Sequence, residues 1–139
     1  MTIEETTDLA ACHALRRTVF IEEQSVPEAD EMDDLDDGAI HLLARDDAGR
    51  PVATARLLIK GEIGKIGRVC VLADQRGTGM GAALMRAAVD ALIARGVREA
   101  HLGSQVHAMG FYEKLGFVAE GPVYDDAGIP HRDMVRVIA

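Results

Sequence analysis

A glycine-rich hexapeptide, Arg76-Gly77-Thr78-Gly79-Met80-Gly81, separates an apolar, strand-like run from a helix-like run. Glycine lacks a Cβ atom, so its backbone tolerates unusual φ angles and lets a ligand approach the N–H groups closely. A helix that begins directly after such a loop leaves its first N–H groups unpaired and pointing towards one place, which favours an anion. The loop therefore predicts a site for a phosphate or pyrophosphate.

The sequences on either side of the loop predict the secondary structure that flanks it. Residues 66–72 end in four consecutive apolar residues, which is typical of a strand buried on both faces. Residues 84–92 carry an apolar stripe at helical spacing, and Arg95-Gly96 has the composition of a last helical turn and its cap. The sequence thus predicts a strand, a glycine loop and a helix in succession.

Two common phosphate-binding loops fit this segment poorly. A P-loop requires Lys and then Ser or Thr after its last glycine, whereas two alanines follow Gly81, so a P-loop is excluded. A dinucleotide-binding fingerprint is met by Gly77, Gly79 and Ala82, but it also requires an acidic residue at the end of the next strand. The next predicted strand, residues 100–103, is followed by Ser and Gln, and too little chain remains for a doubly wound sheet.

A third kind of loop has Arg or Gln, two residues of any type, Gly, one further residue and then Gly or Ala. Arg76, Gly79 and Gly81 match it, and this pattern resembles the pyrophosphate loop of the GNAT family of acyl-CoA-dependent N-acyltransferases. Residues 108–117 resemble the same family's helix-to-strand element, with its F-Y-x-x-x-G-F core unbroken. Looser similarity at residues 17–24 and 128–134 points to a subgroup of small bacterial members, many with unknown acceptors.

The resemblance implies an α/β fold of one domain over residues 1–139. We expect a central mixed, mostly antiparallel sheet with helices on both faces and a parallel strand pair that splays apart at the acyl-CoA site. The implied activity is transfer of an acetyl group from acetyl-CoA to a primary amine of a small molecule or peptide, by direct attack. The alternative is a catalytically silent acyl-CoA-binding module that regulates a partner.

The resemblance also implies which residues bind acetyl-CoA. Backbone groups of Val69, Cys70 and Val71 would hold the pantetheine arm, while their side chains face the core. The loop would hold the pyrophosphate through its N–H groups and the helix N-terminus, where a dipole of about half a charge favours an anion. The residues of that loop are Arg76, Gly77, Thr78, Gly79, Met80 and Gly81.

Tyr112, inside the second motif, is the candidate general acid and a further contact to the cofactor. A phenol with an ordinary pKa of about 10 stays protonated at neutral pH, so it can donate a proton to the departing CoA thiolate. A purely structural role is the other interpretation, because Ala108, Phe111, Tyr112 and Leu115 share one helical face.

The general base is less clearly defined. Some members of the family carry a glutamate on the strand before the loop, where this chain has Arg68 and no carboxylate. The amine proton would then leave through water or to a side chain from elsewhere. The candidates are three histidines and three carboxylates: His41, His107, His131, Glu23, Asp30 and Glu31. His131 ranks first, and Glu23 and Asp30 follow.

The net charge of −8 is unevenly distributed. Between Arg17 and Arg45 there are nine acidic residues and no Lys or Arg, so the rest of the chain is nearly balanced. An acidic protein lacks the basic face that nucleic acid requires. A run of charge is usually a solvated surface. The functional interpretation is that this run lines the acceptor pocket and attracts a cationic amine. The predicted acceptor-site residues are Glu23, Asp30, Glu31, His41 and His131.

Other classes of protein are disfavoured. The chain has no apolar run near the length of a membrane span and no signal-like segment, so we expect a cytoplasmic protein without a membrane partner. Cys12 and Cys70 lie far apart and lack metal-ligand spacing, which predicts reduced, buried thiols and no metal site. The sequence leaves open whether the protein forms a homodimer.

Alternation and turn residues predict the remaining elements. A helix capped by Thr7 or Asp8 should follow a short first strand, and the acidic run should be a loop with one helical turn. The expected strands are residues 1–6, 40–45, 52–59, 118–124 and 132–138, with turns at residues 46–49, 60–62 and 125–128. The order is a helix and an antiparallel meander, a β-α-β-α unit and a terminal hairpin. A mixed sheet with helices on its faces is the simplest packing.

Overall fold

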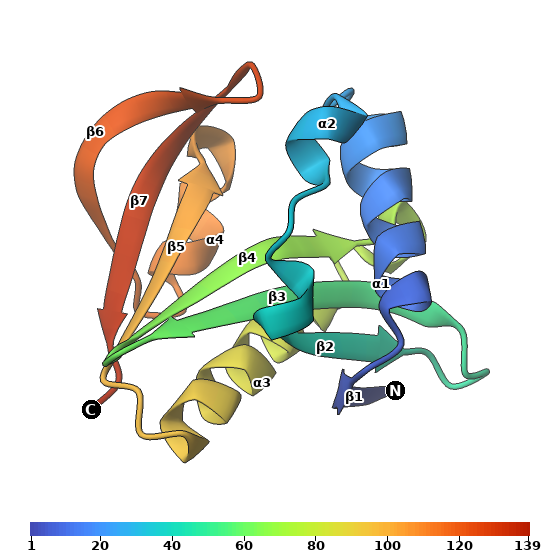
Figure 1. Cartoon of the computed structure of the whole chain (residues 1–139), viewed down its shortest axis with the longest axis horizontal. Coiled ribbons are helices and arrows are strands. Elements are labelled where there is room, and N and C mark those ends of the chain that lie inside the picture. The colour runs from blue at the N-terminus through green and yellow to red at the C-terminus, as the bar shows by residue number, and fades with distance from the viewer.

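One sheet runs through the whole chain, and the computed structural model describes all residues 1–139. Its strands are β1 (Thr2–Thr6), β2 (Ile40–Arg45), β3 (Pro51–Lys60), β4 (Ile63–Val71), β5 (Glu99–Gln105), β6 (Val118–Asp126) and β7 (Ile129–Val137). They lie in the order β1-β2-β3-β4-β5-β7-β6 (Figure 1). Every neighbouring pair is antiparallel except β4 and β5, so the predicted mixed, mostly antiparallel sheet is confirmed.

The helices are α1 (Leu9–Arg16), α2 (Glu28–Glu31), α3 (Met80–Ala94) and α4 (Met109–Glu113). A π-helical segment, η1 (Arg17–Glu23), continues α1, and three 3₁₀ turns are η2 (Asp36–Gly38), η3 (Ala73–Gln75) and η4 (Val106–Ala108). The acidic run therefore contains two helical turns, α2 and η2, where the sequence predicted one. No helix combines the length and the apolar composition needed to cross a membrane.

Helices cover both faces of the sheet, as predicted. Leu42 packs in the main core with the buried side chains of α3, whereas its neighbour Leu43 packs with Cys12 and Leu15 of α1. Adjacent residues of a strand point to opposite faces, so α1 and α3 lie on opposite faces of the sheet (Figure 1). Asp8 begins α1, because its carboxylate accepts a hydrogen bond from the Ala11 N–H at 3.1 Å.

Strands β4 and β5 pair only at one end. The register joins residues 63–65 of β4 to residues 99–101 of β5, and no pairing continues beyond Lys65 and His101 (Figure 1). Strand β5 stays paired with β7 as far as Gln105. The second half of β4 thus has an edge without a strand partner on the β5 side. This is the splayed parallel pair that the sequence predicted.

A β-bulge interrupts the pairing of β4 with β3. Thr54 pairs with Cys70 and Arg56 pairs with Gly67, so β4 holds one more residue than β3 between these two pairs. Arg68 lies in this bulge with a φ angle of +49°, which is rare for a residue other than glycine.

The bulge changes which face the following side chains occupy. Ile66 packs in the main core with α3, whereas Cys70 packs on the α1 face, although four residues of regular strand would keep both on one face. Val69 and Val71 consequently pack against the α3 side. Arg68 turns to the α1 face, where it donates a hydrogen bond to the backbone carbonyl of Glu31.

Gly64 provides a test of how tightly α3 packs on β4. A Cβ atom at Gly64 would lie 2.5 Å from a methyl carbon of Leu92, which is fully buried. We expect Gly64→Ala to lower the free energy of unfolding by about 1 to 3 kcal/mol, because the core must shift to admit the methyl group. Urea denaturation followed by circular dichroism measures this difference.

Gly67→Ala is the matched control, because no atom lies within 4 Å of a Cβ at that position of the same strand. Equal stability of the two variants would show that α3 is not packed against β4 as described.

Candidate active site

The splay between β4 and β5 opens into a cavity of about 670 Å³. Its walls come from η1, α2, the second half of β4, the glycine loop, β5, α4 and the hairpin between β6 and β7. The predicted site residues that line it are Val69, Cys70, Val71, Arg76, Gly77, Gly79, Gly81, Tyr112, Asp30, Glu31, His107 and His131. Four others, Glu23, His41, Thr78 and Met80, do not line it.

The glycine loop adopts a backbone that other residues would resist. Gly77 has a φ angle of +77° and Gly79 one of +87°, both in the left-handed region. Gly79 is the N-cap of α3, and no side chain caps the first turn of that helix. The unpaired N–H groups of a 15-residue helix therefore face the loop, where an anion is favoured. Met80 is buried beneath the loop, and Thr78 donates a hydrogen bond to the Gln75 carbonyl.

Gly81 is needed for a different reason. A Cβ atom there would lie 3.3 Å from the Phe111 ring, so its absence lets the start of α3 approach α4 closely. Phe111 in turn contacts Tyr112 edge to face, with ring centroids 5.0 Å apart and planes at 77°. The glycine loop therefore sets the position of the helix that carries Tyr112.

Tyr112 packs within an aromatic cluster and also faces the cavity. Its ring also packs edge to face on Phe117, at 6.3 Å, within the aromatic cluster. Its hydroxyl makes no hydrogen bond to another protein group, and the residue lines the cavity. Burial raises the pKa of Tyr112 above its ordinary value, so the phenol keeps its proton at neutral pH.

Arg76 is already paired in the structure. Its guanidinium donates two hydrogen bonds to the Glu23 carboxylate, at 2.9 and 2.5 Å, and a third from Nε to the Val71 carbonyl at 3.0 Å. The hydrogen bonds from Arg76 lower the pKa of Glu23. Glu23 lies outside the cavity and is held ionised by a cation, which makes it a weak base.

His131 has its basic nitrogen free. Its Nδ1 lies 2.7 Å from the Ile129 carbonyl oxygen, and because a carbonyl can only accept, Nδ1 must donate. The neutral ring then carries its lone pair on Nε2. The ring stacks on Tyr124, with centroids 6.0 Å apart and planes at 26°, and both residues line the cavity.

The other two candidate histidines use Nε2 as a donor. His107 lies 2.7 Å from the side-chain oxygen of Gln105, whose own amide nitrogen donates to Gln24 at 3.0 Å. His41 is buried on β2, where its Nε2 lies 2.9 Å from the Asp36 carbonyl, and it does not reach the cavity. The bond from Gln105 to Gln24 links β5 to the end of η1, and the sequence reasoning missed both residues.

Most of the acidic run is neutralised. Five of its nine carboxylates form ion pairs with arginine: Glu23, Glu28, Glu31, Asp33 and Asp36. Three of these five join three arginines in a cluster that we call the arginine network. Its members are Arg16, Arg56, Arg68, Glu31, Asp33 and Asp36. The carboxylate of Asp30 forms no ion pair with arginine, and the residue lines the cavity.

The arginine network is largely buried. Arg16 and Glu31 are 1% and 4% exposed and lie 2.5 Å apart, and Arg16 also donates to Asp36 at 2.9 Å. Arg56 donates to Asp33 at 2.7 Å and to Asp36 at 3.1 Å. The network fastens the acidic segment to α1, β3 and β4.

Both cysteines are free and buried, as predicted. Cys70 lines the cavity, but burial raises its pKa to about 12, so it remains a thiol and a poor nucleophile. No group of three or more His, Cys, Asp or Glu side chains is arranged to hold a metal ion.

Comparison with known proteins gives a consistent result. The family model described as an acetyltransferase (GNAT) domain matches residues 5–138. The Bacillus subtilis protein "Uncharacterized N-acetyltransferase YjcF" is 36% identical over 123 residues, which cover 88% of this chain and 87% of the relative.

Two solved structures share the fold closely. An acyl-CoA N-acyltransferase from Pseudomonas aeruginosa is 35% identical, with a TM-score of 0.86 over 98% of this chain and 97% of the other. The crystal structure of Escherichia coli ElaA is 31% identical, with a TM-score of 0.84 over 97% of this chain and 99% of the other.

Acid should destabilise the protein through the arginine network. Burial alone would raise the pKa of Asp36, but hydrogen bonds from Arg16, His13 and Arg56 outweigh it and the pKa is lowered. Burial would also raise the pKa of Asp33, but the hydrogen bonds from Arg56 and from the Leu35 N–H, together with the charges of Arg56 and Arg68, outweigh it and the pKa is lowered. A lowered folded-state pKa contributes stability that is complete above the unfolded value of about 3.9 and is lost as the pH falls below it.

We therefore expect the free energy of unfolding to fall between about pH 4 and pH 2, and Asp36→Asn to flatten that dependence. At neutral pH the substitution should cost about 3 to 5 kcal/mol, because it leaves buried arginine charge without its partner. Asp37→Asn, at an exposed residue without an ion pair, is the control. An unchanged acid profile in Asp36→Asn would refute this account of the network.

Proposed function

Because this chain belongs to the GNAT family of acetyltransferases, we propose that it transfers an acetyl group from acetyl-CoA to the nitrogen of a primary amine. One observation carries the proposal. A single cavity is bordered by the glycine loop at the start of α3, by the unpaired half of β4 and by the Tyr112 side chain. The glycine loop can bind an anion, the unpaired half of β4 offers backbone hydrogen-bonding groups, and Tyr112 can donate a proton.

The loop fits the pyrophosphate of the cofactor. No atom lies within 4 Å of a Cβ built on Gly77 or Gly79, so an anion has room to approach the backbone there. From the loop, an extended chain can follow the free edge of β4 back through Val71 and Val69. The N–H groups of these residues and the Val69 carbonyl are suited to hydrogen bonds with the amides of the pantetheine arm, as an added strand would make, whereas the Val71 carbonyl already accepts from Arg76. The acyl group would then lie near Arg68.

Acetyl-CoA supplies the acetyl group as a thioester, whose carbonyl carbon the neutral amine attacks. The C–N bond forms, the C–S bond breaks and the sulfur leaves with the electron pair. Tyr112 donates its hydroxyl proton to that sulfur and regains a proton from solvent. His131 accepts the proton from the amine nitrogen, directly or through water, with the free lone pair of Nε2. The pairing of Glu23 with Arg76 disfavours Glu23 as the base.

The alternative function is an acyl-CoA-binding module without catalysis. The two are separated by incubating the protein with acetyl-CoA and a panel of primary amines while the release of free thiol is followed. An enzyme releases thiol in proportion to the amine consumed. Calorimetric binding of CoA without thiol release from any amine would favour the binding module.

The loop assignment is tested with Gly79→Val. A branched side chain at a φ angle of +87° would disturb the loop and stand where the anion meets the backbone. We expect CoA affinity, measured by calorimetry, to fall about 30- to 150-fold, which corresponds to about 2 to 3 kcal/mol.

Gly49→Val is the matched control for strain, because Gly49 has a φ angle of +84° in the exposed turn between β2 and β3. Both variants should lose stability, but only Gly79→Val should lose affinity for CoA. Equal CoA affinity in the two variants would rule out the loop as the pyrophosphate site.

The role of Tyr112 is tested with Tyr112→Phe. The substitution keeps the ring that packs on Phe111 and Phe117 and removes only the proton donor. Loss of a general acid typically costs about 100- to 10,000-fold in kcat. A thiolate is a good leaving group, so we expect a loss near 100-fold with CoA affinity and melting temperature preserved. Full turnover in a variant whose chemical step is rate-limiting would make Tyr112 a packing residue only.

A further inference from the structure

The acceptor end of the cavity lies on one face of the sheet. Gly103 and Gln105 of β5 pair with Asp133 and His131 of β7, and alternation places all four on the face opposite to the buried Leu102. Leu102 belongs to the core beneath α3, so these four residues share the α1 face with Arg68. We call the part of the cavity on this face, between α2 and the hairpin of β6 and β7, the acceptor chamber.

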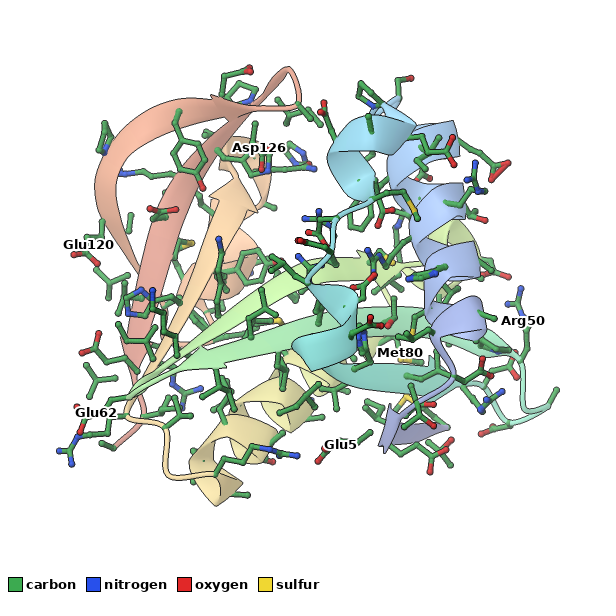
Figure 2. All side chains as sticks on the ribbon, viewed as in Figure 1. Glu5, Arg50, Glu62, Met80, Glu120 and Asp126 are labelled. Carbon is green, nitrogen blue, oxygen red and sulfur yellow. The ribbon has the colours of Figure 1, made fainter.

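The far wall of the acceptor chamber is built around Gly103. A Cβ atom on Gly103 would lie 2.5 Å from the Tyr124 hydroxyl, which donates to Asp133 at 2.8 Å. Tyr124 thus lies across β5, where its ring stacks on that of His131. Asp126, which Figure 2 marks on the hairpin on the side towards α2, lines the chamber and has no ion-pair partner.

Two cations of β4 face this chamber, which Asp30 and Glu31 of the acidic run also line. Lys65 is exposed, lines the cavity and has no ion-pair partner. Arg68 also lines it, with its side chain 26% exposed. Burial and the nearby charge of Arg56 lower the pKa of Arg68.

The guanidinium of Arg68 is held by one nitrogen and free at another. Its Nη2 donates to the Glu31 carbonyl at 3.0 Å, to the Asp30 carbonyl at 3.4 Å and to the Asp33 carboxylate at 3.2 Å. Its Nη1 makes no hydrogen bond to the protein, and its buried Nε lies 3.7 Å from a Glu31 carboxylate oxygen without a hydrogen bond. The side chain is anchored on α2, and its Nη1 remains available as a hydrogen-bond donor.

The backbone at Arg68 is strained in a way that maintains this arrangement. The left-handed conformation of a residue other than glycine costs on the order of 1 kcal/mol, and it persists only where the surroundings enforce it. Here the bulge between β3 and β4 and the three bonds of Nη2 enforce it. A regular strand would turn Arg68 to the other face.

We propose that the acceptor amine carries a carboxylate, which Arg68 and Lys65 bind while the amine nitrogen faces the thioester. This inference rests on the proposed acetyl transfer. The free Nη1 and the ammonium of Lys65 are the donors for that carboxylate. Asp30 and Asp126, the carboxylates without ion pairs that line the cavity, complement the ammonium form of the same molecule. A purely cationic amine would meet two like charges on β4.

The test uses amines that differ only in their far end. A series of two to six carbons carries an amine at one end and a carboxylate, a carboxamide or a second amine at the other, with thiol release from acetyl-CoA as the readout. For at least one chain length, we expect kcat/KM for the carboxylate to exceed that for the carboxamide of the same length at least tenfold. Most of this difference should be a lower KM for the carboxylate. A charged hydrogen bond accounts for a preference of about ten- to a hundredfold.

Arg68→Gln and Lys65→Gln should each reduce the ratio of the carboxylate's kcat/KM to that of its carboxamide about tenfold or more. Lys60→Gln is the matched control, because Lys60 is exposed on β3 outside the cavity. Lys65 is a surface residue, so its variant carries the test even if Arg68→Gln does not fold.

Two results would overturn the inference and leave the proposed acetyl transfer standing. One is turnover of all three kinds of amine without preference for the carboxylate, and the other is an unchanged preference in every folded variant. Absence of thiol release with every amine would overturn the proposed acetyl transfer and the inference with it.

Discussion

Strand β4 changes the direction of its side chains at Arg68, and both walls of the cavity depend on that change. Before the bulge, Ile66 packs under α3. After it, Val69 and Val71 take the α3 side and Cys70 takes the α1 side. A strand that alternated regularly through Arg68 would place the valines and the arginine on the wrong faces. The loss of pairing with β5 exposes the backbone edge that the cofactor is proposed to follow.

The arginine network explains why an acidic segment of such charge density lies close to the sheet. Six ionised side chains are balanced in sign, and the buried members are joined by hydrogen bonds of 2.5 to 3.1 Å, although each arginine keeps one buried nitrogen without a hydrogen bond. Such a cluster contributes little net stability relative to an apolar core, but removal of one member leaves an uncompensated charge. Its structural effect is to fix α2 on β4. The acceptor chamber then has a rigid wall on that side, and the free carboxylates left there are Asp30 and, across the chamber, Asp126.

Local sequence signals predicted the helices and strands, whereas contacts between residues far apart in the sequence determine the site. The glycine loop and the stripe of α3 could be read from short windows of sequence, because turn chemistry and periodicity are local properties. The splay of β4 from β5 followed from the family resemblance. The pair of Arg76 with Glu23 joins residues 53 positions apart, and Arg56 reaches Asp36 across 20. Counting charge between Arg17 and Arg45 could not find these partners, so the sequence predicted either a solvated acidic surface or an acidic wall of the acceptor pocket. The bulge at Arg68 directly follows Gly67, and an isolated glycine within a strand is a local signal of a bulge that the prediction did not use.

We expect acyl-CoA to lie in the splay, with its pyrophosphate on the glycine loop and its arm along β4. Backbone amide chemical shifts, recorded on the ¹⁵N-labelled protein as CoA is added, locate the bound cofactor. The amide signals of Val69, Val71, Gly77, Gly79 and Gly81 should move together with one dissociation constant, while those of β1 and β2 stay in place. Saturable binding of CoA that moves signals elsewhere and leaves the loop and β4 unchanged would contradict this placement.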